Sequence, residues 1–104
     1  MIVAPESEGL VEAEIVPNLK VTTASGYEIT VAGSMQSMDA IRIEYQRIGG
    51  ASWSIAAFLT KLPGTFTITP QTPGEPEMGR IRGQFIKKNA DFGNPSPEYP
   101  VTLS

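Results

Sequence analysis

The chain has 104 residues, of which 40% are hydrophobic, and it carries a formal net charge of -3 at pH 7. This length suits one domain that buries its own core, and the negative charge disfavours a nucleic-acid partner, which requires neutralisation of phosphates. Because the chain has no cysteine and no histidine, the usual zinc sites, thiolate nucleophiles and Ser-His catalysis are excluded, and we expect a protein that is not an enzyme and has no metal and no cofactor.

Residues 1–16 precede the regular pattern and are expected to be an N-terminal extension: a linker, or an extra edge strand in which Val11, Ala13 and Ile15 alternate with Glu12 and Glu14. The start, MIVAPESEGL, lacks the basic region and apolar run of a signal peptide, and no stretch is long and apolar enough for membrane insertion. The domain proper is therefore expected to span residues 17–104.

Residues that alternate between hydrophobic and polar recur through this domain, whereas no convincing helical period does. A period of two is typical of half-buried strands, so the sequence predicts an all-β fold. The segment 52–62 is an apolar run that suits a strand or a short helix, and we favour the strand. The seven expected strands lie within residues 19–23, 27–33, 40–48, 52–62, 65–70, 79–89 and 98–104.

The glycine pair Gly49-Gly50 follows the clearest of these strands, in which Ile41, Ile43 and Tyr45 face one way and Arg42, Glu44 and Gln46 the other. The pair lacks the spacing of a phosphate-binding loop, and no helix follows it. Glycine permits the positive φ angles of tight turns, so this pair predicts a hairpin that leads to Trp53.

The order of several short motifs resembles a fibronectin type III domain of the bacterial and phage type. These motifs are VPNLKV at 16–21, IEYQRIGGASW at 43–53 and NADFGNPSPEYPVTL at 89–103. The resemblance implies a seven-stranded, immunoglobulin-like β-sandwich. Two positions depart from the family pattern: no tryptophan ends the second strand, and Ile81 stands where the family carries the tyrosine of its corner.

The resemblance also implies a structural or interaction module, a spacer or docking domain of a larger bacterial or phage protein on a cell surface, virion or tail. Its partners would be other protein domains or subunits. The alternative is a carbohydrate-binding module that exposes Trp53, Tyr45 and Tyr27 on one sheet face. Trp53 itself has three interpretations: packing against the outside of the sheet beside Tyr45, replacement of the missing core tryptophan, or a stacking platform for a sugar.

The loop 89–97 is the second candidate for an interaction surface, because the corresponding loop of the resembling family is a frequent contact region. It carries Asp91, Phe92 and Asn94. Phe92 either folds back over the end of the sandwich or forms the tip of an interaction site. Four cations, Arg80, Arg82, Lys87 and Lys88, form either a solvated sheet face or an anion site.

Overall fold

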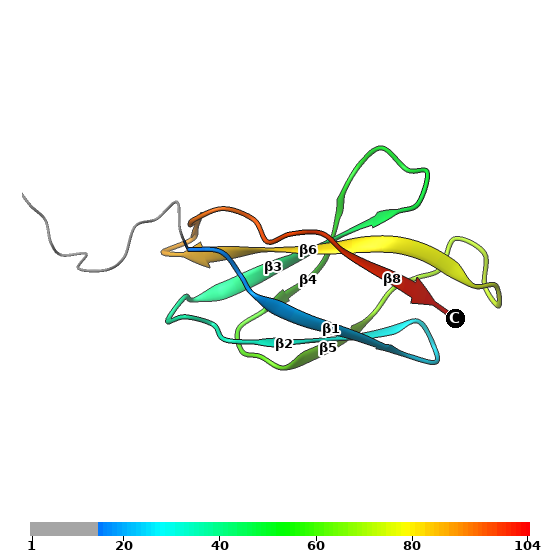
Figure 1. The fold of residues 1–104 in the computed structure, drawn as a ribbon, viewed down its shortest axis with the longest axis horizontal. Helices are drawn as coiled ribbons and strands as arrows, with labels where there is room; N and C mark the ends of the chain where they lie inside the picture. Colours follow the sequence, from blue (N-terminus) through cyan, green and yellow to red (C-terminus); the bar gives the residue numbers. More distant parts are fainter. Residues whose placement is uncertain (1–14) are drawn as a thin grey trace, which may run out of the picture.

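The computed structural model describes residues 15–104, which form eight β-strands in two antiparallel sheets (Figure 1). No described segment is a helix that could span a membrane. The strands are β1 (Leu19–Ala24), β2 (Glu28–Gly33), β3 (Ala40–Arg47), β4 (Ser54–Leu59), β5 (Gly64–Thr67), β6 (Glu77–Lys87), β7 (Ala90–Asp91) and β8 (Tyr99–Leu103).

One sheet has three strands in the order β1-β2-β5, and the other has five. In the larger sheet β4 pairs with β3, β3 pairs with β6, and both β7 and β8 pair with the far side of β6. β6, with eleven residues, is the longest strand of the described chain, and its residues 79–86 pair with β3. The chain is therefore an all-β, two-sheet fold consistent with a β-sandwich.

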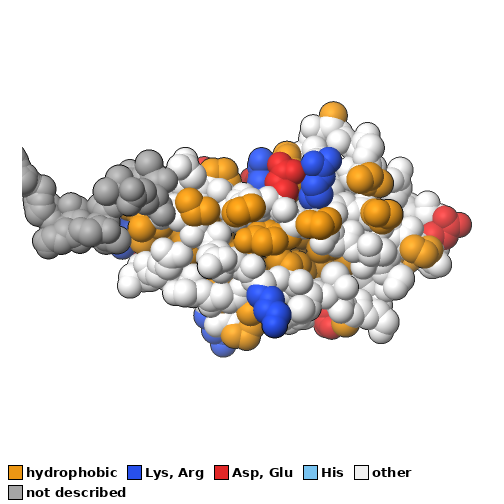
Figure 2. All heavy atoms as spheres, viewed as in Figure 1, with side chains coloured by type: hydrophobic (Ala, Val, Ile, Leu, Met, Phe, Trp, Pro, Cys, Tyr) orange, Lys and Arg blue, Asp and Glu red, His pale blue; other side chains and the backbone are white. Residues whose placement is uncertain are grey.

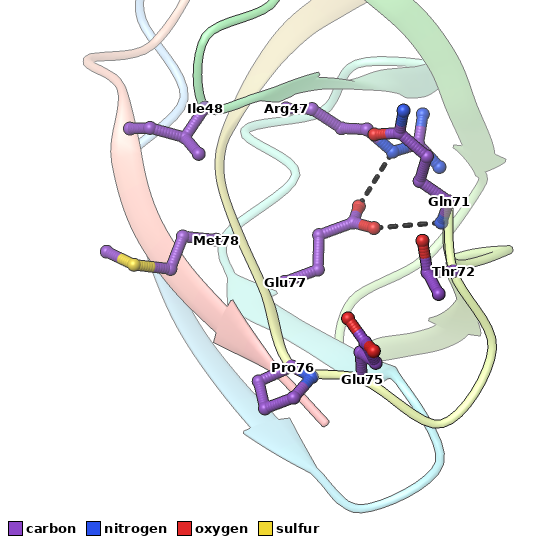
Figure 3. A pocket seen from close by; sticks show the side chains of 8 residues that line it. All are labelled: Arg47, Ile48, Gln71, Thr72, Glu75, Pro76, Glu77 and Met78. Carbon is purple, nitrogen blue, oxygen red and sulfur yellow. Dashed lines mark hydrogen bonds and ion pairs between the residues drawn. The ribbon is translucent and has the colours of Figure 1, made fainter.

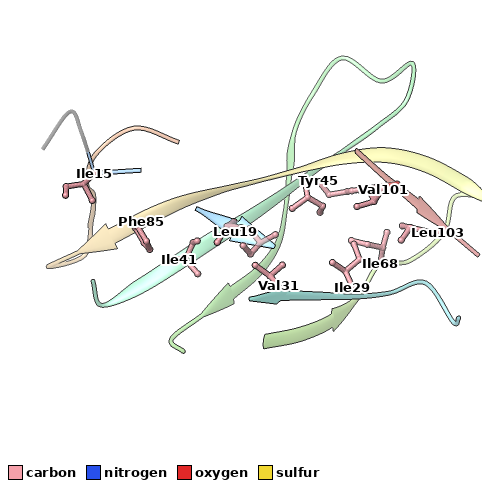
Figure 4. Packing of buried hydrophobic residues seen from close by; sticks show 12 residues of the cluster. Ile15, Leu19, Ile29, Val31, Ile41, Tyr45, Ile68, Phe85, Val101 and Leu103 are labelled. Carbon is pink, nitrogen blue, oxygen red and sulfur yellow. The ribbon is translucent and has the colours of Figure 1, made fainter. Parts of the chain in front are cut away.

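The core fills the space between the two sheets and consists of side chains that point inward from the strands (Figure 4). Ile41, Ile43 and Tyr45 of β3 face inward as the alternation predicts. Gly79 of β6 is required by the Tyr45 ring, since a Cβ atom there would lie 2.6 Å from Cζ of that ring. The buried hydrophobic residues are Ile15, Leu19, Ile29, Val31, Ile41, Ile43, Tyr45, Ile68, Ile81, Phe85, Val101 and Leu103.

Each of the seven expected segments overlaps a strand, and the ambiguous segment 52–62 contains β4 rather than a helix. The turn at the glycine pair is also confirmed: Gly49 has a φ of 80°, and the Gly50 N–H donates to the Arg47 carbonyl at 2.9 Å. The connection from β3 to β4 is, however, longer than the pair alone, and Trp53 lies in it before β4 begins. Figure 1 shows this connection projecting from the sheet in green.

The eighth strand, β7, lies at the start of the segment expected to be the loop 89–97. Lys88 and Asn89 form a two-residue turn between β6 and β7, and both have positive φ angles, of 53° and 64°. That is the conformation of a tight hairpin turn with the twist the strands need. Asn is a usual residue there and Lys is not, so the sequence signal for this turn is weak.

The expected extension, residues 1–16, falls almost entirely outside the described residues, including Val11 and Ala13 of the proposed edge strand. Ile15 is the first described residue. It is buried, and its carbonyl accepts a hydrogen bond from the Asn94 N–H at 3.1 Å. The chain therefore enters the domain alongside the segment that follows β7.

Candidate functional site

Two of the three aromatic residues predicted to share an exposed face, Tyr45 and Trp53, lie on opposite faces of the five-stranded sheet. Tyr45 is in the core with 2% of its surface exposed, because its position in β3 has the inward parity of Ile43. Trp53 is half-buried on the outer face, where the Arg82 guanidinium carbon lies 4.1 Å from its ring centroid. The expected aromatic face for a sugar is therefore not assembled from this pair. Trp53 packs on the outside of the sheet, against Arg82 instead of Tyr45.

Trp53 belongs to a chain of contacts on that face, which we call the outer-face network: Trp53, Arg82, Glu44, Arg42 and Asp91. Glu44 accepts from Arg82 Nε at 2.6 Å and from Arg42 Nε at 2.9 Å, one bond to each carboxylate oxygen. Arg42 then makes a bidentate pair with Asp91, at 2.8 and 3.1 Å. The network thus connects β3, β6, β7 and the segment before β4.

Within this network the pair Arg42 and Asp91 shifts the pKa of both partners. Hydrogen bonds from Arg42 hold the pKa of Asp91 below its ordinary value, and the same pair raises the pKa of Arg42. Figure 2 shows basic and acidic side chains next to one another along the edge above β6. Arg80 is also paired, with Glu98 at 2.9 Å. Two of the four cations considered for an anion site, Arg80 and Arg82, are thus already neutralised by carboxylates.

Phe92, the aromatic residue of the loop 89–97, folds back onto the domain. Its half-buried side chain packs against the core, and its N–H donates to the Phe85 carbonyl at 2.9 Å. Its own carbonyl accepts from Gln84 Nε2 at 3.0 Å. Asp91 and Asn94 on either side are exposed. The structure therefore separates the five candidate residues: Tyr45 is in the core, Trp53 and Asp91 are in the outer-face network, and Phe92 packs on the core beside exposed Asn94.

A polar cluster that the sequence analysis did not identify lies beside a cavity of about 310 Å³ between the end of β3 and residues 71–78 (Figure 3). Glu77 is at its centre. One carboxylate oxygen accepts from the Tyr45 hydroxyl at 2.7 Å and lies 2.8 Å from Arg47 Nε, and the other accepts from the Gln71 N–H at 2.9 Å. Figure 3 shows Ile48 and Met78 pointing away from this cluster.

These contacts fix the charge of Glu77. Burial on its own disfavours the carboxylate, but the hydrogen bonds from Gln71 and Tyr45 and the positive charge of Arg47 outweigh it and lower the pKa of Glu77. Burial, and then the bond to Glu77, raise the pKa of Tyr45. An ionised carboxylate with both oxygens engaged is a poor proton donor at neutral pH. The cluster therefore acts as a tether for the segment 69–77, to which Arg47 Nη2 adds a bond to the Thr69 carbonyl at 2.6 Å.

Sequence signals exist for part of these two clusters. The outward positions of Arg42, Glu44 and Arg82 follow from alternation, but their mutual contact depends on the register between β3 and β6, which places Glu44 opposite Arg82. Glu77 carries no such signal, because it is joined to Gln71 across a loop. Within residues 15–104 no group of three or more Asp or Glu side chains is placed to hold a metal ion.

Comparison of the sequence with known proteins finds no matching family model and no matching curated protein.

Proposed function

We propose that residues 17–104 form a fibronectin type III-like, immunoglobulin-like sandwich that serves as a non-enzymatic spacer or docking module of a larger bacterial or phage surface or tail-type protein. The strand order supports the family resemblance. In the proposed fold β1-β2-β5 would be strands A, B and E, and β4-β3-β6-β8 would be strands C′, C, F and G. In this proposal β7 is a short addition next to strand F.

The observation that carries the spacer role is the position of the two ends of the described chain. In Figure 1 the chain enters at one end of the long axis, before β1, and leaves at the other end, after β8. A module with this geometry adds its own length between whatever is joined to its two ends. A module with adjacent ends would project sideways from a chain instead.

Backbone hydrogen bonds hold both of these ends to the body. The carbonyl of Ser104 accepts from the N–H groups of Gly26 and Tyr27 at 2.9 and 3.1 Å, and the carbonyl of Ile15 accepts from Asn94 at 3.1 Å. Fixed ends transmit direction as well as length. This favours a stiff spacer over a flexible connector.

The test is the length of tandem proteins. One, two, three and four copies of the full 104-residue chain, joined directly, are measured by small-angle X-ray scattering, with Gly/Ser linkers of the same residue count as the control. If the module is a spacer, the maximum dimension of the tandem proteins should grow linearly with copy number. The dimension of the flexible control should grow roughly as the square root of its length. Growth of the tandem proteins that follows the flexible control, or compaction into a globule, would contradict the proposal.

A further inference from the structure

Strand β4 exposes two large apolar side chains at positions where a half-buried strand normally carries polar residues. Ile55 and Phe58 are 57% and 58% exposed, whereas Ala56, Ala57 and Leu59 are half-buried against the core. The cause is a bulge: the register with β3 shifts so that one residue of β4 is extra. Ile55 and Phe58, which are three residues apart, therefore point to the same face of the sheet. A β-bulge commonly changes the direction of side chains in this way.

The same strand is an open edge of the five-stranded sheet. Its only strand partner among the described residues is β3. Natural edge strands are commonly protected by charges, especially lysine, or by proline. Every residue from Ile48 to Thr60 is uncharged and none is proline. Apart from its bulge, β4 therefore offers unpaired backbone groups and two exposed apolar side chains with none of the usual protection.

A cavity of about 270 Å³ lies beside this edge, where β4 begins and β5 ends. Ser54, Ile55 and Ala56 of β4 line it on one side, and Thr67 at the end of β5 with Ile68 and Thr69 after it line it on the other. The edge of β4 is thus open toward this cavity where the strand begins, whereas at its other end Leu59 lies against Gly64 of β5.

We propose that two copies of this chain pair through β4 in an antiparallel arrangement, with the two-fold axis between Ala56 and Ala57. This register places Ile55 of one copy opposite Phe58 of the other, and the same contact recurs on the other side of the axis. Four exposed apolar side chains are then covered together. The two open edges supply each other's missing hydrogen bonds, which joins two five-stranded sheets into one.

Charge and symmetry favour a second copy over an unrelated partner. In this register Lys61 of one copy faces Ser52 of the other, so no like charges meet along the pairing. A two-fold contact needs a self-complementary surface, and the Ile55–Phe58 pair provides one. The contact is small: four side chains of this kind cover on the order of 400 Å² of apolar surface, well below the area of about 1,600 Å² typical of stable complexes. The pairing is therefore weak and reversible.

This inference stands apart from the spacer role, because it concerns contact between copies side by side and not connection along one chain. Each can fail without the other. A monomeric protein whose tandem copies still grow linearly keeps the spacer, and a dimer whose tandem copies collapse keeps the pairing.

The first test is sedimentation equilibrium of the full chain from micromolar to millimolar concentration, with Phe58→Lys as the disrupting variant. Met78→Lys is the matched control, since Met78 is 54% exposed on the same sheet but distant from β4. We expect the wild type to dimerise, Phe58→Lys to weaken dimerisation roughly tenfold or more, and Met78→Lys to leave it unchanged. A wild type that stays monomeric at millimolar concentration, or equal loss in both variants, overturns the proposal. Circular dichroism verifies that both variants fold.

The second test fixes the register. The chain has no cysteine, so the variants Ile55→Cys and Phe58→Cys each carry one thiol. Residues directly opposite in an antiparallel pair have Cα atoms about 4.5–5.5 Å apart, a distance that a disulfide can span. An equimolar mixture should therefore oxidise faster to a linked heterodimer than either variant oxidises alone to a homodimer. Preferential homodimer formation would place the axis elsewhere and reject this pairing.

Discussion

Glu77 joins segments that are distant in the sequence: Tyr45 and Arg47 of β3 on one side and Gln71 of the loop before β6 on the other. Its carboxylate is more buried than any other in the described ion pairs, with 11% of the side chain exposed. A carboxylate in this position stabilises the fold only while it is ionised. The tether of the segment 69–77 therefore depends on pH.

The variant Glu77→Gln tests this dependence. The pKa of Glu77 is lowered in the folded protein, so its contribution is complete above the ordinary glutamate pKa of about 4.3 and is lost as pH falls through the lower, folded value. At neutral pH we expect the substitution to reduce the free energy of unfolding by about 1–3 kcal/mol, because it removes the charge of a largely buried carboxylate that accepts from Tyr45 and Gln71. Thermal unfolding between pH 2 and 7 measures both effects, and the variant should lose less stability in acid than the wild type.

Glu98→Gln is the control for this experiment. Glu98 pairs with Arg80, and both side chains are 44% exposed, so the expected cost is below about 1 kcal/mol. An acid profile of Glu77→Gln identical to that of the wild type would show that Glu77 does not titrate with unfolding.

Arg82 has a double role in the outer-face network, because it donates to Glu44 and covers the ring of Trp53. The variant Arg82→Ala removes both contacts and should reduce the free energy of unfolding by about 1–2 kcal/mol. Trp53 is the only tryptophan of the chain. Its fluorescence therefore reports the site directly, and we expect an emission shift to longer wavelength as water replaces the guanidinium.

Arg80→Ala is the matched variant, two residues away on the same face of β6. Its side chain pairs only with exposed Glu98 among the contacts described, so it should leave the tryptophan emission unchanged and cost less than about 1 kcal/mol. Equal emission shifts in the two variants would mean that Trp53 responds to the charge of the face as a whole and not to Arg82 above its ring.

Among the strands, the turn between β6 and β7 contains a strained residue. Lys88 has a φ of 53°, which is unfavourable for a side chain with a Cβ atom. Its N–H donates to Asp39 Oδ2 at 2.7 Å, and this bond does not depend on the side chain. The variant Lys88→Gly should therefore raise the free energy of unfolding by about 0.5–1 kcal/mol, measured by urea denaturation.

Lys87→Gly is the control, since Lys87 is the last residue of β6. Glycine in a strand costs conformational entropy, so this variant should lower the free energy of unfolding by about 0.5–1 kcal/mol. The opposite signs at neighbouring lysines distinguish relief of backbone strain from loss of a positive charge. Two changes of the same sign would contradict the argument.

The strands that could be predicted from sequence are those in which the alternation of apolar and polar residues alone identifies the buried and the exposed face. β3 is the best example, with every inward position apolar up to Tyr45. β4 gave an ambiguous signal because its bulge breaks the period of two, so its large side chains could not be assigned to a face. β7 was missed because two residues are too few for a pattern. The contacts of Glu44 and Glu77 depend on register and on loop closure, which local sequence does not encode.

For the domain as a unit, the ends lie at opposite ends of the long axis, and β1 and β8 run toward the same end (Figure 1). β1 is bonded to β2, and β8 is bonded to β6, each along most of its length. Force applied between the two ends of the described chain is therefore directed along both strands. Such a load strains many ladder hydrogen bonds at once instead of opening them one after another.

Single-molecule pulling tests this load path. In one double variant the handles are attached at Asn18→Cys and Ser104→Cys, at exposed positions near opposite ends. In the other they are attached at Ser25→Cys and Ser104→Cys, where the neighbouring Gly26 N–H bonds to the Ser104 carbonyl. The native chain has no cysteine to compete with these handles. We expect the first geometry to require the higher unfolding force, because the second separates β8 from its neighbours starting at one end. Equal forces would mean that the ladders of β1 and β8 do not bear the load, and a spacer built on this fold would then resist tension through its core packing alone.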